Sequence, residues 1–193
     1  MLLHVDESIP AAYPATPADL SPQTAALDPA LIWQRIEAFI RYRWAERSVV
    51  WIVTGSAYMS GAGTPWQPPL TPATGITIEV WDRGAEEWQA AGQVPKAPVG
   101  YLLARNCTYR VTATVGSTDT PPAAVLEAYR RLAEYMAAEL AAPVGAKSYS
   151  VSIGQISERI SLDRDHAAAS IHKSGAADLL RPYRRLGVND EAA

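Results

Sequence analysis

Few side chains in the sequence are of the kinds that perform catalysis. Cys107 is the single cysteine, so the chain cannot form an internal disulfide. Its neighbours Asn106, Thr108 and Tyr109 form no nucleophile motif and include no histidine to activate the thiol. We therefore interpret Cys107 as a structural thiol. The sequence also contains neither a phosphate-binding glycine loop nor a serine-nucleophile elbow. We expect no catalytic residues and no enzymatic activity.

Metal binding has as little support. His166 and His172 are six residues apart, whereas two ligands on one helical face must be three or four apart. The acidic residues Glu158, Asp163 and Asp165 lack the spacing of a calcium loop and the glycine that such a loop needs. The sequence thus predicts neither a metal ion nor another cofactor.

Six tryptophans could supply a stacking surface for a glycan or for bases. We expect Trp33, Trp51 and Trp81 to lie in the core. The others, expected to pack loops onto a sheet, are Trp44, Trp66 and Trp88. A β-rich module that binds a glycan or a protein through this tryptophan-containing segment is the alternative function.

One segment near the C-terminus combines apolar and basic residues around a proline. In SGAADLLRPYRRLGV (174–188), Pro182 interrupts a small-residue helix. Its arginines could complement the helix dipole or contact DNA, but apolar anchors beside arginine are more typical of a protein interface. The residues of this predicted docking segment are Leu179, Leu180, Arg181, Tyr183, Arg184, Arg185 and Leu186.

Length and composition limit the class of protein. The chain has 193 residues, of which 48% are hydrophobic and 19% charged, which is typical of a globular protein with one core and room for an insertion. Its net charge of −3 argues against a free-standing nucleic-acid binder. The sequence has no signal-type leader and no apolar run of membrane length, so we expect no membrane association.

The elements that position these residues fall into three parts. Residues 1–27 are rich in proline, which predicts an N-terminal arm without a long helix. Residues 28–146 predict a domain in which two helices flank an inserted β region. Residues 147–193 predict a C-terminal arm that carries the docking segment, with 148–154 as a strand or an extended stretch.

Both helices are amphipathic. The first is predicted over 28–44, because Asp28 is a good N-cap and is followed by proline at the first helical position. The second is predicted over 121–141. Their apolar faces are Ile32, Trp33, Ile36, Phe39 and Ile40, and then Val125, Tyr129, Leu132, Met136 and Leu140. The charged side of the second helix carries the four-apart pairs Glu127–Arg131 and Arg130–Glu134.

Between the helices, residues 47–116 change to the alternation of strands. The turn DRGAEEW (82–88) predicts a hairpin that pairs 76–82 with 87–91. The β-branched and aromatic runs are 48–55, 75–82 and 108–116; in the last, Tyr109, Val111, Ala113 and Val115 share one face. The predicted fold class is therefore α+β, with an antiparallel β insertion.

Three stretches in the right order resemble one known family. YRVTATVGSTDTPPAAVLEAYRRLAEYMAAEL (109–140) resembles the head–tail connector, or adaptor, proteins of long-tailed phages and gene transfer agents, in which a strand ending in glycine leads into such a helix. SGAADLLRPYRRL (174–186) looks like the C-terminal signature of that family. Residues 51–82 resemble its insertion-bearing branch. The resemblance covers most of residues 28–188, and the proline-rich arm departs from the family pattern.

The resemblance implies a virion structural protein with a helical connector core. Twelve copies would form a ring between the portal protein and the stopper protein that begins the tail. The ring would extend the DNA channel, through which DNA passes without sequence-specific binding. The portal contact would be made by the docking segment. The protein would lie at the head–tail interface of the virion, and in the host cytoplasm during assembly.

Overall fold

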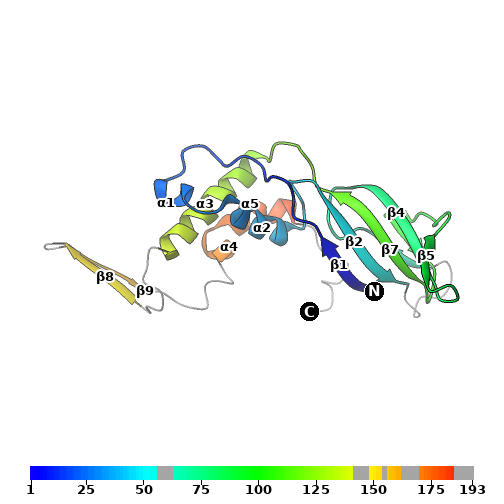
Figure 1. Ribbon diagram of the computed structural model, residues 1–193. Helices are drawn as coiled ribbons and strands as arrows, with labels where there is room; N and C mark the ends of the chain where they lie inside the picture. The colour runs from blue at the N-terminus through cyan, green and yellow to red at the C-terminus, as the bar shows by residue number, and fades with distance from the viewer. Residues whose placement is uncertain (56–62, 141–147, 154–155, 162–169, 185–193) are drawn as a thin grey trace. The chain divides into compact units, whose positions relative to one another are not determined.

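The computed structural model describes residues 1–55, 63–140, 148–153, 156–161 and 170–184 (Figure 1). The chain divides into two compact units, each built from segments that are distant in sequence. The sheet unit comprises Met1–Ala12 and Arg41–Asp119, and the helical unit comprises Tyr13–Ile40 and Thr120–Leu186. Helices and antiparallel strands are both present, in agreement with the predicted α+β class.

A five-stranded antiparallel sheet in the order β1-β2-β7-β4-β5 forms the sheet unit (Figure 1). Its central strands, β2 (Arg47–Thr54) and β7 (Thr108–Val115), pair along their whole lengths. On the other side of β7 lies β4 (Ala73–Asp82), which forms a hairpin with β5 (Glu87–Ala90). This pairing confirms the hairpin predicted around residues 82–88.

Three further strands belong to the sheet unit. The edge strand β1 (Leu2–Glu7) pairs with β2. The strands β3 (Thr64–Trp66) and β6 (Tyr101–Leu103) form a separate antiparallel pair. A Pro/Gly-rich stretch contains β3 and another directly precedes β6, and we predicted no strand at either place.

One face of the sheet is the core of this unit. Strand alternation places the buried side chains of β2 and β7 on the same face, where Trp51 stands opposite Val111. Leu70 and Leu103 cover them from outside the two central strands. The buried residues of β2 and β7 are Val49, Trp51 and Val53, and then Tyr109, Val111, Ala113 and Val115. The face predicted for β7 is therefore confirmed.

An ion cluster fastens β1 to the sheet unit. The Glu7 carboxylate accepts hydrogen bonds from Arg43 Nε at 2.6 Å and Arg47 Nη1 at 3.0 Å. Both arginines are nearly buried, at 9% and 8% exposed. Burial alone would raise the pKa of Glu7, but the two guanidinium groups outweigh it and the pKa is lowered. The predicted N-terminal arm of residues 1–27 thus begins as a strand whose last residue, Glu7, is bound by arginines distant in sequence.

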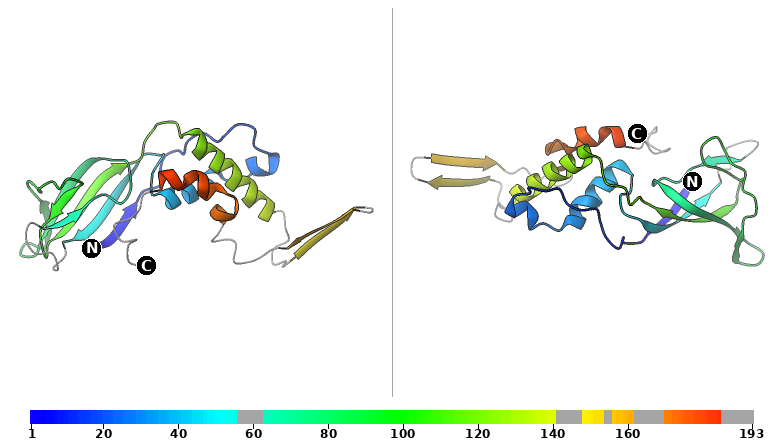
Figure 2. Two further views of the ribbon diagram at one scale, coloured as in Figure 1. Left: turned by 180° about the vertical axis from the view of Figure 1, so that it is seen from behind. Right: turned by 90° about the horizontal axis from the view of Figure 1, so that it is seen from above.

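The helical unit is organised around α3 (Ala123–Leu140), which packs against the other α-helices of the unit (Figure 2). The others are α1 (Pro22–Ala25), α2 (Pro29–Ile40), α4 (Ser170–Lys173), α5 (Ala176–Leu180) and the short 3₁₀ helix η2 (Arg181–Tyr183). None of the helices within the described residues is long and apolar enough to cross a membrane.

The predicted faces of α2 and α3 meet each other. Trp33 is fully buried and its ring lies 5.1 Å from that of Tyr129. Asp28 Oδ1 accepts a hydrogen bond from the Ala30 amide at 2.9 Å, as its N-cap position predicts. The helix ends at Ile40 rather than at residue 44, because Arg41 has a φ of 60° and left-handed backbone cannot continue an α-helix.

A separate hairpin follows α3 in sequence. Its strands, β8 (Ser148–Ile153) and β9 (Ile156–Ser161), pair only with each other within the described residues. The strand considered for residues 148–154 is β8. Its partner β9 was not predicted, because the charged residues Glu158 and Arg159 interrupt its apolar pattern.

Replacing Glu7 with glutamine tests whether the ion cluster holds β1. We expect the free energy of unfolding at pH 7 to fall by about 1–3 kcal/mol, since two nearly buried arginines lose their charged acceptor. Because the folded-state pKa of Glu7 is lowered, its contribution is complete above the ordinary pKa near 4.5 and is lost as the pH falls through the folded-state value.

Urea denaturation at several pH values measures this difference. The advantage of the wild type over Glu7→Gln should shrink on acidification. Asp6→Asn, an exposed neighbour on the same strand, is the control and should change stability little. Equal stability of Glu7→Gln and wild type at pH 7 would show that the cluster does not hold β1.

Candidate interaction surfaces

The predicted docking segment lies on α5 and η2 of the helical unit. Leu180 is fully buried, and Ala176 and Ala177 of the same helix are buried as well. Because α5 packs against α3, these residues belong to the core of their own unit. Pro182 lies within the first turn of η2, where its missing N–H would have no intrahelical acceptor. The side chain of Leu180 therefore packs inside the helical unit.

The other described members of the docking segment reach the surface. Arg181 and Arg184 are exposed, while Leu179 and Tyr183 are half-buried. The guanidinium carbon of Arg184 lies 5.3 Å from the centre of the Phe39 ring, a cation–π contact that orients the side chain. Arg185 and Leu186 lie outside the described residues. The structure thus presents two arginines together at the end of α5.

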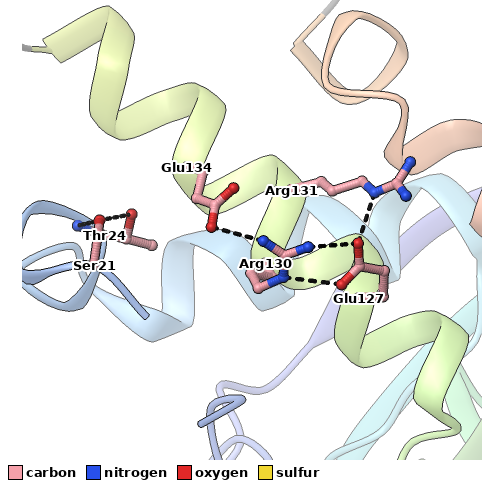
Figure 3. Close-up of polar contacts among 6 residues, drawn as sticks. All are labelled: Ser21, Thr24, Glu127, Arg130, Arg131 and Glu134. Atoms are coloured by element: carbon pink, nitrogen blue, oxygen red, sulfur yellow. Dashed lines mark hydrogen bonds and ion pairs between the residues drawn. The ribbon is translucent and has the colours of Figure 1, made fainter. Parts of the chain in front are cut away.

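The charged face of α3 is neutralised within the helix (Figure 3). Glu127 accepts hydrogen bonds from Arg130 Nη2 at 2.7 Å and Arg131 Nε at 2.8 Å, and Arg130 Nη1 also donates to Glu134 at 2.9 Å. Arg130, followed by Arg131, lowers the pKa of Glu127 to about 2. The two predicted pairs are confirmed, with an added Glu127–Arg130 pair.

This neutralisation distinguishes α3 from the end of α5. Within the described residues, Arg181 and Arg184 form no ion pair, whereas both arginines of α3 do. Arginine without a carboxylate partner remains available for the bidentate contacts that guanidinium groups form with acidic partners. The end of α5 is therefore a basic surface with apolar residues beside it.

Three tryptophans lie deep in the structure. Trp33 and Trp51 are fully buried, as predicted. Trp44 is also buried, at 6% exposed, and its ring contacts that of Tyr42. Trp66 is half-buried and packs edge-on against Trp51, with ring centres 5.9 Å apart. These four side chains are explained by packing.

Trp81 and Trp88 are placed differently. Trp81 is not in the core as predicted; it is half-buried and packs edge-on against Trp88, its register partner, on the face of the sheet opposite the core. The cause is strand alternation, because Val80 shares the core face with Tyr109.

The ring of Trp88 already has a partner from its own sheet. The Arg110 guanidinium carbon lies 5.0 Å from the ring centre, and Arg110 Nε donates to Glu79 at 2.6 Å. This contact lowers the pKa of Glu79. A sugar that stacked on this face of Trp88 would have to displace the guanidinium group.

A surface that sequence analysis missed lies on β1. Leu2, Leu3 and Val5 of this strand are 37%, 50% and 40% exposed. Within the described residues β1 pairs only with β2, so its second edge makes no backbone hydrogen bonds to a strand. The available signal was the apolar run before the first proline, but it was masked by the proline-rich stretch that follows.

Comparison with known proteins gives matches among solved structures alone: no family model and no curated protein matches the sequence. The chain is similar to a chain in the neck of an empty gene transfer agent particle computed with C6 symmetry, with a TM-score of 0.52 and 14% identity. It is also similar to a chain in the virion of a native gene transfer agent particle, with a TM-score of 0.50 and 14% identity.

Each match covers 97% of this chain and 98% of the other. The chain has the fold of a gene transfer agent neck chain. At this level of identity the likeness shows the fold alone. It supports the resemblance inferred from the sequence.

Truncating two neighbouring leucines tests which part of the docking segment belongs to the core. Leu180→Ala should lower the free energy of unfolding by about 2–5 kcal/mol, because it leaves a cavity between α5 and α3. The matched control Leu179→Ala, at a half-buried position, should cost much less. Urea denaturation measures both. If both variants were as stable as the wild type, Leu180 would not anchor α5.

Proposed function

We propose that this chain is a structural protein of the virion neck, an adaptor that joins the portal to the tail stopper in a tailed phage or gene transfer agent. The observation that supports this most is the fold likeness to a neck chain over 97% of one sequence and 98% of the other. A likeness of that extent includes both units, so it does not rest on a widespread motif such as a helix pair. The role is structural and requires no catalytic group.

A ring is the form in which such an adaptor would act. The neck that contains the similar chain was computed with C6 symmetry, so its components repeat around an axis. We infer that this chain also assembles around an axis, as a ring of twelve copies that extends the DNA channel. Its net charge of −3 suits a channel through which DNA slides, because phosphate contacts need basic residues.

The portal contact is assigned to the end of α5. Arg181 and Arg184 are exposed there without a carboxylate partner among the described residues, and Tyr183 lies between them. The same surface includes Leu179, and it continues in sequence to Arg185 and Leu186. Leu180 contributes indirectly, because its buried side chain helps to hold α5 against α3. A contact of this size is weak in one copy and becomes durable when it is repeated around a ring.

Charge reversal at the end of α5 tests the assignment. The double variant Arg181→Glu/Arg184→Glu should bind the portal protein encoded with this chain at least about tenfold more weakly, since two arginines at an interface centre are worth more than about 1.4 kcal/mol. Lys173→Glu, an exposed change on the neighbouring helix α4, is the matched control and should bind as the wild type does. Native mass spectrometry of the mixture gives both affinity and copy number.

The wild-type chain should be a monomer or weak oligomer alone and a ring on the portal. Wild-type affinity in the double variant would disprove the assignment to α5. Failure of the wild-type chain to bind the portal at all would contradict the adaptor function itself.

A further inference from the structure

The exposed edge of β1 has the features of an edge that pairs with a further strand. Natural edge strands are normally protected by lysine, proline or a covering element. The stretch Leu2–Val5 has neither lysine nor proline, and its three apolar side chains are 37–50% exposed. Leu2 and Val5 stand opposite Val53 and Trp51, so they continue the core face of the sheet to its edge. That apolar face therefore ends at β1, because no further described strand pairs with β1 to extend it.

The hairpin of β8 and β9 would be stabilised by pairing with a larger sheet. It forms a sheet of its own, and an isolated two-stranded hairpin is at best marginally stable in water. The residues that share one face by register are Tyr149, Val151 and Ile153 with Ile160, Glu158 and Ile156. Those on the other face are Ser148, Ser150 and Ser152 with Ser161, Arg159 and Ser157. Apart from Glu158, one face of the hairpin is thus apolar and the other is polar.

We propose that β8 of one copy pairs with the free edge of β1 in a second copy of this chain. Both strands are six residues long. Pairing would extend the five-stranded sheet by the hairpin, and the apolar face of Tyr149, Val151 and Ile153 would continue the face of Leu2 and Val5.

The opposite edge of the five-stranded sheet and the other edge of the hairpin both carry charged residues. On the far side of the sheet, β5 has four residues and includes the charged Glu87. On the hairpin, β9 carries Glu158 and Arg159, whereas β8 has no charged residue. Charges on an edge strand discourage pairing. On β1 the acidic residues are confined to its end, at Asp6 and Glu7, and Glu7 is already paired with Arg43 and Arg47. The stretch Leu2–Val5 of β1 and the whole of β8 contain no Asp, Glu, Lys or Arg, so these two edges are the least protected.

The contact is heterologous, because it joins two different surfaces of the same chain. Every copy offers one β1 edge and one hairpin, so copies joined head to tail leave no surface unused when the series closes into a ring. The inference deepens the proposed function, on which it rests for the presence of neighbouring copies.

Cross-linking of mixed variants tests the contact without the portal. In a Cys107→Ser background, one preparation carries His4→Cys and another carries Ser150→Cys. By register these positions lie on the polar faces of β1 and β8, so the apolar residues stay intact. The two purified proteins are mixed at high concentration, treated with a short bismaleimide and separated on a denaturing gel. We expect a covalent heterodimer that contains both variants, identified by mass spectrometry.

Two controls test whether cross-linking is specific to the β1 edge. Ala90→Cys on β5, mixed with Ser150→Cys, should give little heterodimer, since it tests the opposite edge of the sheet. Adding Val5→Lys to the His4→Cys chain should abolish the product, whereas Val99→Lys, at another exposed valine of the sheet unit, should not.

Three results would overturn the proposal: no heterodimer, equal yield from the β5 position, or a product confined to single chains when both cysteines are placed in one diluted protein. The last would mean that the hairpin covers β1 of its own chain. A chain that cross-links in this way but does not bind the portal would keep this inference and reject the adaptor function, so the two failures are distinguishable.

Discussion

The pairing of β2 with β7 is the contact on which the two-unit organisation depends. Arg47 at the start of β2 stands opposite Val115 at the end of β7, so the two ends of the long β insertion meet. Gly116 follows with a φ of 110°, and a Cβ atom there would lie 2.4 Å from the Ala45 carbonyl oxygen. Only glycine fits this close approach without displacing backbone. Because the insertion closes on itself, α2 and α3 can pack together although the whole sheet separates them in sequence.

Features that depend on neighbours within one element were predictable from the sequence. The alternating residues of β7 are buried as their period indicates, and the charge pairs of α3 form at the expected spacing. The β4–β5 hairpin formed where the turn residues predicted it. In each case the signal lies in side chains a few residues apart, so no distant contact was needed to interpret it.

Features that depend on distant residues were not predictable. β1 pairs with β2, and its Glu7 is bound by Arg43 and Arg47, contacts with residues about 35 to 50 positions away that no local pattern encodes. Leu180 looked like an interface anchor from its neighbours, yet it is buried because α3 covers it. The sequence was therefore enough to locate the basic segment. The packing of α5 on α3 was needed to tell that Leu180 is buried while Arg181 and Arg184 are exposed. The docking surface that we propose is therefore narrower and more basic than the segment predicted from the composition.

The fold, the basic end of α5 and the complementary edges of β1 and β8 all fit a protein whose surfaces are completed by neighbours in a neck assembly. The most direct test is an electron cryo-microscopy reconstruction of the neck of particles produced by the cell that encodes this chain. We predict density for this chain as a ring between the portal and the first tail protein. A neck in which a different chain fills that position, with this chain absent from the purified particle, would contradict the account.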